Sequence, residues 1–442
     1  MKQLVVIFTL WLAWMPIGAQ KTLTLEECLK LGIENNLSLE GSRNEMRKAK
    51  HLLSENRAKL WPQISAVAGF NDNFNPPVSV TDGSAYGNLY NVTKTLQYNA
   101  SAGLQLQMPL YNQTVYTAVD IARTLNELNC LSYEKAREDL MMQISKMYYL
   151  GQNTMEQLTL IQENMVRLRE LRDITLAFFD NGMAMEVDVK RVNINLENQQ
   201  VQYDNAKSML VQQLNLLKYV MDYPADEEIT LTPVDTERMQ SASLTGLRGD
   251  LYELQLLQSQ EKLAGQQKDL IRQGYLPSLT LIGSWMYSAY TDKARHWFHS
   301  GPSNHWYPST GLGITLRVPI FDGFDKRARI RKAQIDQENA KLNYENTLKN
   351  MQTQYLNATN ELMNNQRNFK KQKDNYLLAE DVYQVTTDRY REGIASMTEV
   401  LQDEMRMSEA QNNYLSAHYN YQVANLALLK LTGQMDRLLQ GN

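Results

Sequence analysis

Apolar and polar residues alternate with a period of two in several segments of the chain. In residues 98–108 the even positions are apolar or aromatic and the odd positions are small or polar. Residues 311–320 repeat this pattern, and residues 63–70 and 278–290 carry weaker versions of it. Alternation of this kind predicts β-strands that have one apolar and one polar face. We therefore expect strands at 62–72, 98–109, 277–290 and 310–320.

The remaining apolar residues follow a helical spacing of three and four. No proline lies between Pro109 and Pro224, or after Pro319, so neither stretch contains a residue that breaks helices. The apolar stripe is narrow and the rest of each helix surface is polar, which is typical of coiled coils. We expect long helical hairpins at 113–222 and 325–433.

The chain consists of two tandem copies of one pattern. Pro109 in MPLYN corresponds to Pro319 in VPIFD, and Gly182 corresponds to Gly393 at a separation of 211 residues. A glycine just past a helix end is typical of a left-handed cap, so Gly182 and Gly393 are expected to turn the chain between two helices. Each copy then runs from a helix through two strands to a long hairpin. We place the first structural repeat at 21–230 and the second at 231–442.

The strands have the length of tilted strands that cross a bilayer, about ten residues. Alternation alone fits a soluble sandwich equally well. The connections at 73–97 and 291–309 favour a membrane barrel, because they are rich in Asn, Gly, Ser and aromatic residues, as external loops are. Four strands cannot close a barrel, and an open sheet edge cannot exist in lipid. We therefore expect several copies to associate symmetrically.

Charge and hydropathy narrow the function classes. The net charge of −4 argues against nucleic acid as a partner, and a mean hydropathy of −0.48 excludes a bundle of membrane helices. Lys2 precedes a short apolar stretch that ends near Pro16 and is followed by small residues. This pattern predicts a signal peptide at 1–20 and an exported protein. The alternative, a membrane anchor, would need a longer apolar stretch.

No pattern in the sequence points to catalysis, a cofactor or a metal site. Cys28 and Cys130 are too few for a disulfide framework or a zinc site. The chain has 21 methionines, but they are scattered along helices and are interpreted as seam residues. His296, His299 and His305 could form a metal site, although the neighbouring tryptophans favour an external loop beside lipid. We find no phosphate-binding loop, nucleophile elbow or paired-histidine motif, so we expect no enzyme activity.

Paired motifs give the chain a family resemblance that covers nearly its whole length. They are MPLYN and VPIFDG after the second strand of each copy, NGMAMEVDV and YREGIASMTEVL at the glycine turns, and LNLLKYV and NLALLKLTG at the repeat ends. In this order the chain resembles the TolC family of outer-membrane factors. The resemblance implies a mainly α-helical fold with membrane strands, a homotrimer with a twelve-stranded barrel, and a long periplasmic part. It also implies a periplasmic adaptor and an inner-membrane RND or ABC transporter as partners, outer-membrane lipid around the barrel, and no cofactor.

The resemblance also assigns candidate gate residues. Tyr390 matches the gate tyrosine of the family, Asp188 matches its acidic partner, and Glu399 matches an acid that lines the aperture. Gln402 stands where a second aperture acid is often found, and Ala395 stands where an arginine can be found, so this gate departs from the family pattern. The alternative is that Asp188 and Glu399 only cap or solvate the first turn after each glycine.

Two further groups of residues are expected to contact the adaptor and to line the barrel. The turns are expected to dock the adaptor through Gly182, Met183, Ala184, Gly393, Ile394, Ala395 and Ser396, and the barrel lumen is expected to contain Gln105, Gln107 and Arg317. The predicted function is a passive outer-membrane duct of a tripartite pump that exports small molecules. The alternatives are an exit channel for type I protein secretion and a coiled-coil spacer of the cell envelope.

Overall fold

The computed structural model describes residues 21–82, 87, 89–234, 246–292 and 306–440. The predicted signal peptide, the three loop histidines and residues 235–245 at the start of the second repeat lie outside the described residues. The chain divides into two compact units. The helical unit is Met1–Glu45, Cys130–Leu256 and Asn343–Asn442, and the sheet unit is Met46–Asn129 and Leu257–Leu342.

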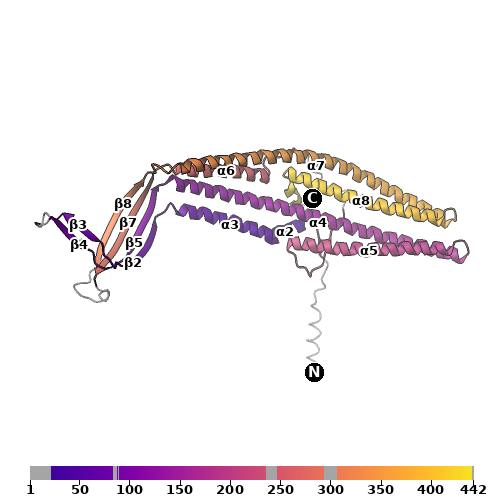
Figure 1. The fold of residues 1–442 in the computed structure, drawn as a ribbon. Coiled ribbons are helices and arrows are strands. Elements are labelled where there is room, and N and C mark those ends of the chain that lie inside the picture. The colour runs from indigo at the N-terminus through magenta and orange to yellow at the C-terminus, as the bar shows by residue number, and fades with distance from the viewer. Residues whose placement is uncertain (1–20, 83–86, 88, 235–245, 293–305, 441–442) are drawn as a thin grey trace, which may run out of the picture. The chain divides into compact units, whose positions relative to one another are not determined.

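The sheet unit contains a four-stranded antiparallel sheet with the strand order β2-β5-β7-β8 (Figure 1). The strands are β2 (Gln63–Asp72), β5 (Tyr98–Tyr111), β7 (Ser278–Thr291) and β8 (Trp306–Arg317). Because β5 pairs with β7, the sheet joins one pair of strands from each sequence repeat. Within the described residues, β2 and β8 each pair along one side only.

The register of this sheet brings the apolar faces of the strands together. Leu281 on β7 lies between Met108 on β5 and Ile314 on β8. Residues directly opposite one another point to the same face, so the alternation in each strand adds up to one apolar face across the sheet. Leu312 and Ile314 are 77% and 64% exposed on this face. The sheet therefore presents a broad apolar surface that the single chain leaves uncovered.

The last strand differs most from the sequence expectation, at both of its ends. Strand β8 begins at Trp306 rather than at residue 310, because Trp306 still pairs with Ala289 on β7. It ends at Arg317 rather than at residue 320, since Pro319 has no N–H to donate and restricts the residue before it. The expected loop at 73–97 contains a separate hairpin, formed by β3 (Val78–Asp82) and β4 (Tyr90–Lys94).

Helices make up most of the remaining described chain. They are α2 (Leu25–Asn35), α3 (Leu37–Ala58), α4 (Gln113–Asp180), α5 (Glu186–Met221), α6 (Tyr252–Gln273), α7 (Asp325–Arg391), α8 (Met397–Leu431) and the 3₁₀ helix η3 (Met435–Leu439). Helices α4 and α7 have 68 and 67 residues, which corresponds to about 100 Å each. The described helices include none that combines the length and apolar character needed to cross a membrane.

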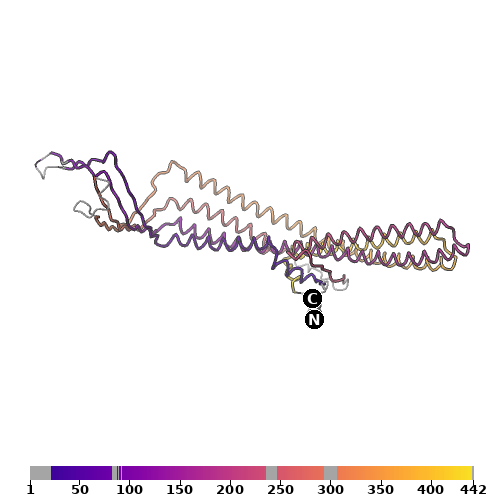
Figure 2. Tube along the Cα trace, turned by 90° about the horizontal axis from the view of Figure 1, so that it is seen from below, coloured from indigo at the N-terminus to yellow at the C-terminus, as the bar shows by residue number. Residues whose placement is uncertain are grey.

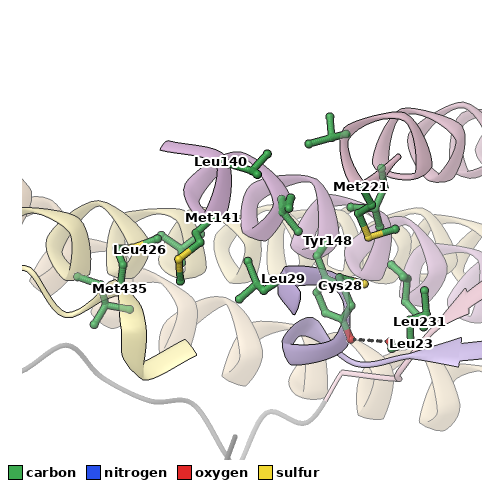
Figure 3. Close-up of a cluster of buried hydrophobic side chains, with 14 of the residues drawn as sticks. Leu23, Cys28, Leu29, Leu140, Met141, Tyr148, Met221, Leu231, Leu426 and Met435 are labelled. Carbon is green, nitrogen blue, oxygen red and sulfur yellow. Dashed lines mark hydrogen bonds between the residues drawn. The ribbon is translucent and has the colours of Figure 1, made fainter. Parts of the chain in front are cut away.

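The core of the helical unit lies where α2 and the short parallel pair β1 (Lys21–Leu23) and β6 (Ile229–Leu231) pack on α4 (Figure 3). Leu29 and Met141 are fully buried there. The Tyr148 hydroxyl donates a hydrogen bond of 3.3 Å to the Leu23 carbonyl, which ties β1 to α4. Helix α2 starts at a capping box in which Thr24 and Glu27 bond each other's backbone N–H groups.

The rest of the helical unit consists of two antiparallel hairpins, α4 with α5 and α7 with α8. Both hairpins turn at the same end of the unit (Figure 2). Near the turns a second apolar cluster joins the hairpins, with Leu171 from α4, Val192 from α5, Tyr383 from α7 and Val400 from α8. This cluster fixes the surroundings of the candidate gate residues.

Candidate functional site

The two turns have the same backbone geometry. Gly182 and Gly393 both have φ near +74°, a conformation that favours glycine. The Gly182 N–H donates to the Phe179 carbonyl at 2.9 Å, and the Gly393 N–H donates to the Tyr390 carbonyl at 2.9 Å. The next residue in each turn donates at 2.8 Å to the carbonyl one position further back. These paired bonds satisfy the carbonyls at the helix ends and reverse the chain, as the sequence analysis expected for both glycines.

The helices that follow the turns start differently. Ser396 precedes α8, and its hydroxyl accepts from the Glu399 N–H at 3.3 Å while the Glu399 carboxylate accepts from the Ser396 N–H at 3.2 Å. This is a complete capping box. Met185 is the corresponding residue before α5, and no side chain caps that helix. Glu399 therefore has the capping role that the sequence analysis left open as an alternative to gating.

Tyr390 lies in the apolar cluster between the hairpins. Its side chain is 6% exposed, and its ring packs against Phe178 with a centroid distance of 5.5 Å. Its hydroxyl donates a 3.4 Å hydrogen bond to the Thr175 hydroxyl, which in turn donates to the Leu171 carbonyl at 2.7 Å. This contact connects α7 of one hairpin to α4 of the other.

The family resemblance suggested Asp188 as the partner of Tyr390, but in the part of the chain that the structure describes the Tyr390 hydroxyl bonds Thr175. Asp188 is nevertheless close enough to act electrostatically. Burial is the main cause that raises the pKa of Tyr390, the bond to Thr175 opposes this shift, and the charge of Asp188 adds to it. The tyrosine therefore stays protonated at neutral pH and remains a hydrogen-bond donor.

Asp188 is bound instead by an arginine of its own helix. The Asp188 side chain is 14% exposed, and its carboxylate accepts from Arg191 at 3.2 Å. The same Arg191 nitrogen lies 3.5 Å from the Thr398 hydroxyl on α8. Arg191 thus links the start of α5 to the start of α8. A second link is formed by Arg391, the last residue of α7, whose guanidinium lies 3.8 Å from the Glu170 carboxylate on α4.

The other predicted turn residues lie at or near the surface. Met183 and Ile394 are 67% and 62% exposed, whereas Ala395 packs against the apolar cluster. Gln402 is exposed on α8, one turn after Glu399. The structure therefore brings Asp188 and Tyr390 near each other, and it leaves Glu399 and Gln402 on the outside of α8 in the single chain.

A buried polar layer behind the turns was missed by the sequence analysis. Gln199 on α5 donates to the Glu404 carboxylate on α8 at 3.3 Å, and these residues are 6% and 4% exposed. Asn164 on α4 donates to Gln411 on α8 at 2.7 Å, and Arg167 donates to the same Asn164 side chain. Burial raises the pKa of Glu404, while Gln199 and Arg167 oppose the shift. In the sequence, the only sign of this layer is that polar residues stand at positions of the apolar stripe. That sign is weak, because these helices are rich in Gln and Asn throughout.

The predicted lumen residues share one face of the sheet. Gln105 lies opposite Ser65 on β2 and Ser284 on β7. Gln107 lies two residues after Gln105 and therefore points to the same face. Gln107 is opposite Ile282, which is opposite Gly313, and Arg317 lies four residues after Gly313 on that same face. This polar face is the opposite of the one formed by Leu281 and Ile314.

Comparisons with known proteins agree with this architecture. The family model described as "Outer membrane efflux protein" matches residues 29–221 and 252–434. The chain is 23% identical over 325 residues to the outer membrane protein TolC of Vibrio cholerae, covering 70% of this chain and 68% of that protein.

Solved structures share the fold. The outer membrane protein VceC of Vibrio cholerae matches with a TM-score of 0.75 and 16% identity, covering 92% of this chain and 96% of that one. The outer membrane channel MtrE of Neisseria gonorrhoeae, solved in an open state, matches with a TM-score of 0.74 and 19% identity, covering 92% and 88%. Because the family model spans both sequence repeats, the chain belongs to the outer membrane efflux protein family, which places it in the outer membrane with a role in efflux.

Proposed function

We propose that three copies of this chain form one passive duct, the outer-membrane part of a tripartite pump that exports small molecules. The observation that carries this proposal is the four-stranded sheet with a continuous apolar face and two edge strands, β2 and β8, that pair on one side only. An unpaired strand edge is not tolerated in lipid, and closed membrane barrels need about eight strands or more. Three copies arranged about one axis would supply twelve strands.

The two faces of the sheet then have distinct roles. The apolar face, with Leu312 and Ile314 strongly exposed in the single chain, would contact lipid. The polar face would line the lumen with Gln105, Gln107 and Arg317. A coiled-coil spacer would have no use for this sheet, so the apolar face favours the duct over the spacer.

The turns are the proposed contact with a periplasmic adaptor, which would connect the duct to an inner-membrane RND or ABC transporter. Exposed apolar side chains support this role, since Met183, Met185 and Ile394 are each more than 60% exposed. The docking surface would consist of Gly182, Met183, Ala184, Gly393, Ile394, Ala395 and Ser396. Transport energy would come from the partner, and we infer no catalytic role for this chain.

The same end of the helical unit is the proposed gate. Tyr390 with Thr175, and Arg191 with Asp188 and Thr398, hold the two hairpins together. A neutral hydrogen bond contributes about 0.5–1.5 kcal/mol, which biases a closed state and is weak enough for an adaptor to overcome. Glu399 and Gln402 would face the axis, where three carboxylates would favour cations over anions.

Single-channel recording in planar lipid bilayers tests this proposal. Tyr390→Phe and Thr175→Val each remove the hydroxyl hydrogen bond between α7 and α4, so both should raise the conductance of the reconstituted channel. Tyr376→Phe is the matched control, because its hydroxyl bonds Glu380 on α7 and Gln411 on α8, both within one hairpin. Conductance that stays at the wild-type value in both contact variants would contradict this gate.

A further inference from the structure

A pocket of about 500 Å³ lies in the sheet unit where β8 gives way to α7. It is lined by Tyr275 and by residues between Pro319 and Arg331. The pocket combines cationic and aromatic side chains and lies directly after the strand that would leave the membrane. Its chemistry is not explained by the duct or by the gate.

Two arginines in the pocket have no carboxylate partner among the residues that the structure describes. Arg327 and Arg331 are exposed and stand four residues apart, so they lie on the same side of α7. Neither forms an ion pair with any residue that the structure describes. Lys326 is already engaged, since its ammonium lies 3.1 Å from Asp322 and 5.2 Å from the Tyr275 ring. Asp322 is the one acidic residue that lines the pocket, and Lys326 neutralises its charge. The guanidinium groups of Arg327 and Arg331 are therefore available for an anion.

The mouth of the pocket is apolar. Ile320, Phe321 and Phe324 are 94%, 76% and 64% exposed. The two phenylalanine rings meet edge to face at 5.5 Å, and Phe324 has a φ of 68°, a conformation that is unfavourable for this residue type. Leu316 and Val318, which precede them in the chain, are also exposed, so exposed apolar side chains extend from the end of β8 to the pocket.

The first repeat has no such pocket chemistry. At a separation of 210 residues, the positions of Arg327 and Arg331 are occupied by Thr117 and Ile121. Thr117 is buried and donates a hydrogen bond to Gln273. The cations are therefore not required by the strand-to-helix connection itself, because the same connection is built without them in the first repeat.

We propose that this pocket binds the phosphate headgroup of an anionic phospholipid in the periplasmic leaflet of the outer membrane. Guanidinium groups match phosphate oxygens in pairs, and basic pockets beside an apolar surface are suited to anionic lipids. Arg327 and Arg331 hold the phosphate, and the acyl chains lie along Ile320, Phe321 and Leu316. The inference rests on the proposed function, since it requires β8 to lie in the membrane.

Native mass spectrometry of the detergent-solubilised protein, with added phosphatidylglycerol or phosphatidylcholine, tests the inference. Wild type is expected to retain phosphatidylglycerol in preference to phosphatidylcholine. The double variant Arg327→Gln/Arg331→Gln is expected to bind phosphatidylglycerol at least tenfold more weakly. The matched control is Arg329→Gln/Lys332→Gln, which removes the same charge from the same two turns outside the pocket and is expected to stay within about twofold of wild type.

Three results would overturn the inference. Equal loss in both double variants would mean that surface charge alone attracts the lipid. Full displacement of the lipid by millimolar inorganic phosphate would mean a site for a free anion. Loss of the trimer in the pocket variant would mean that a second copy of the chain covers the pocket. Trimer mass and channel conductance of the wild type, measured on the same preparation, report on the proposed function separately.

Discussion

The two turns of the helical unit have one backbone and two different sets of side chains. Both glycines have the same φ, and both turns make the same backbone hydrogen bonds. The turn at Gly393 is followed by a complete capping box, and Tyr390, three residues before this glycine, is buried between the hairpins. The helix after Gly182 starts without a side-chain cap. Phe179, the residue that corresponds to Tyr390, is 42% exposed.

This difference separates what shapes a turn from what holds it in place. Glycine is sufficient for the shape, since both turns use it in the same way. Stability comes from side chains, and the second hairpin supplies most of them through Tyr390 and Ser396. The first hairpin depends on contacts made across to the second, such as Arg191 to Thr398. We therefore expect the turn at Gly182 to open first when the hairpins separate.

The largest expected effect is the contrast between the two aromatic positions. Tyr390→Ala removes a buried ring and should destabilise the joined turns by about 3–5 kcal/mol. Phe179→Ala removes a ring that is 42% exposed and should cost less, about 1 kcal/mol. Hydrogen–deuterium exchange of the amides around both turns measures this local stability. Similar costs at the two positions would show that the turns are equivalent after all.

The second effect is the cost of a side chain at each glycine. Gly182→Ala and Gly393→Ala should each cost about 1–2 kcal/mol, because alanine is strained at this φ. No atom lies within 4 Å of the added methyl group at either position, so strain is the only expected cause. Gly41→Ala within α3 is the control, and it should be neutral or stabilising by up to about 1 kcal/mol. Unequal costs at the two turns, measured by the same exchange experiment, would contradict a shared backbone geometry.

The third effect exchanges the caps. Ser396→Ala should destabilise the start of α8 by about 1 kcal/mol, through loss of the capping box. Met185→Ser should stabilise the start of α5 by a similar amount, since it supplies the missing cap. Together the two changes should reverse the order in which the turns exchange amide hydrogens. If the order stays the same, contacts across the hairpins outweigh the caps.

The smallest expected effect is a pH dependence carried by Glu404. Burial raises its pKa in the folded state above the ordinary value of 4.5, so the folded state holds the proton more tightly than the unfolded state. The contribution of protonated Glu404 to the free energy of unfolding is fully present below pH 4.5. It is lost as the pH rises through the pKa of the folded state. Glu404→Gln should therefore stabilise the turns at pH 7 and match wild type near pH 4.

Asn193 provides the control for this pH dependence, because it occupies the corresponding position in the first repeat and is exposed. Asn193→Glu places an acid in water, where its pKa should be ordinary, and should add no comparable dependence. Unfolding temperatures of the wild type, Glu404→Gln and Asn193→Glu between pH 4 and pH 8 make the comparison. A Glu404→Gln variant that is less stable than wild type at pH 7 would show that the bond to Gln199 outweighs the burial of the charge.

The sequence was sufficient where local chemistry decides the structure. Proline-free stretches and a single glycine predicted helices that run to Asp180 and Arg391, and period-two alternation predicted the apolar face that the sheet register confirms. The mainly helical fold and the family were also predicted correctly. The capping box at Ser396 was visible as a serine three residues before a glutamate, although Glu399 was read first as an aperture acid.

The sequence was insufficient where distant segments meet. The bond between Tyr390 and Thr175 was not predicted, because the register of α7 against α4 decides which hydroxyl or carboxylate is in reach, and Thr175 lies 215 residues away. The burial of Gln199 and Glu404 depends on the same register. The bounds of β8 were also missed, since they depend on pairing with β7.

The central claim is that β8 of one copy pairs with β2 of the next to close the wall. Disulfide crosslinking tests it most directly, in a protein with Cys28 and Cys130 replaced by serine. Ser65→Cys on β2 would be combined in turn with Ser309→Cys, Gly311→Cys, Gly313→Cys or Thr315→Cys on β8. Within one chain β2 and β8 are three strand spacings apart, about 14 Å, which is too far for a disulfide. We predict that at least one combination gives a covalent trimer on a denaturing gel, and single chains in every combination would contradict the account.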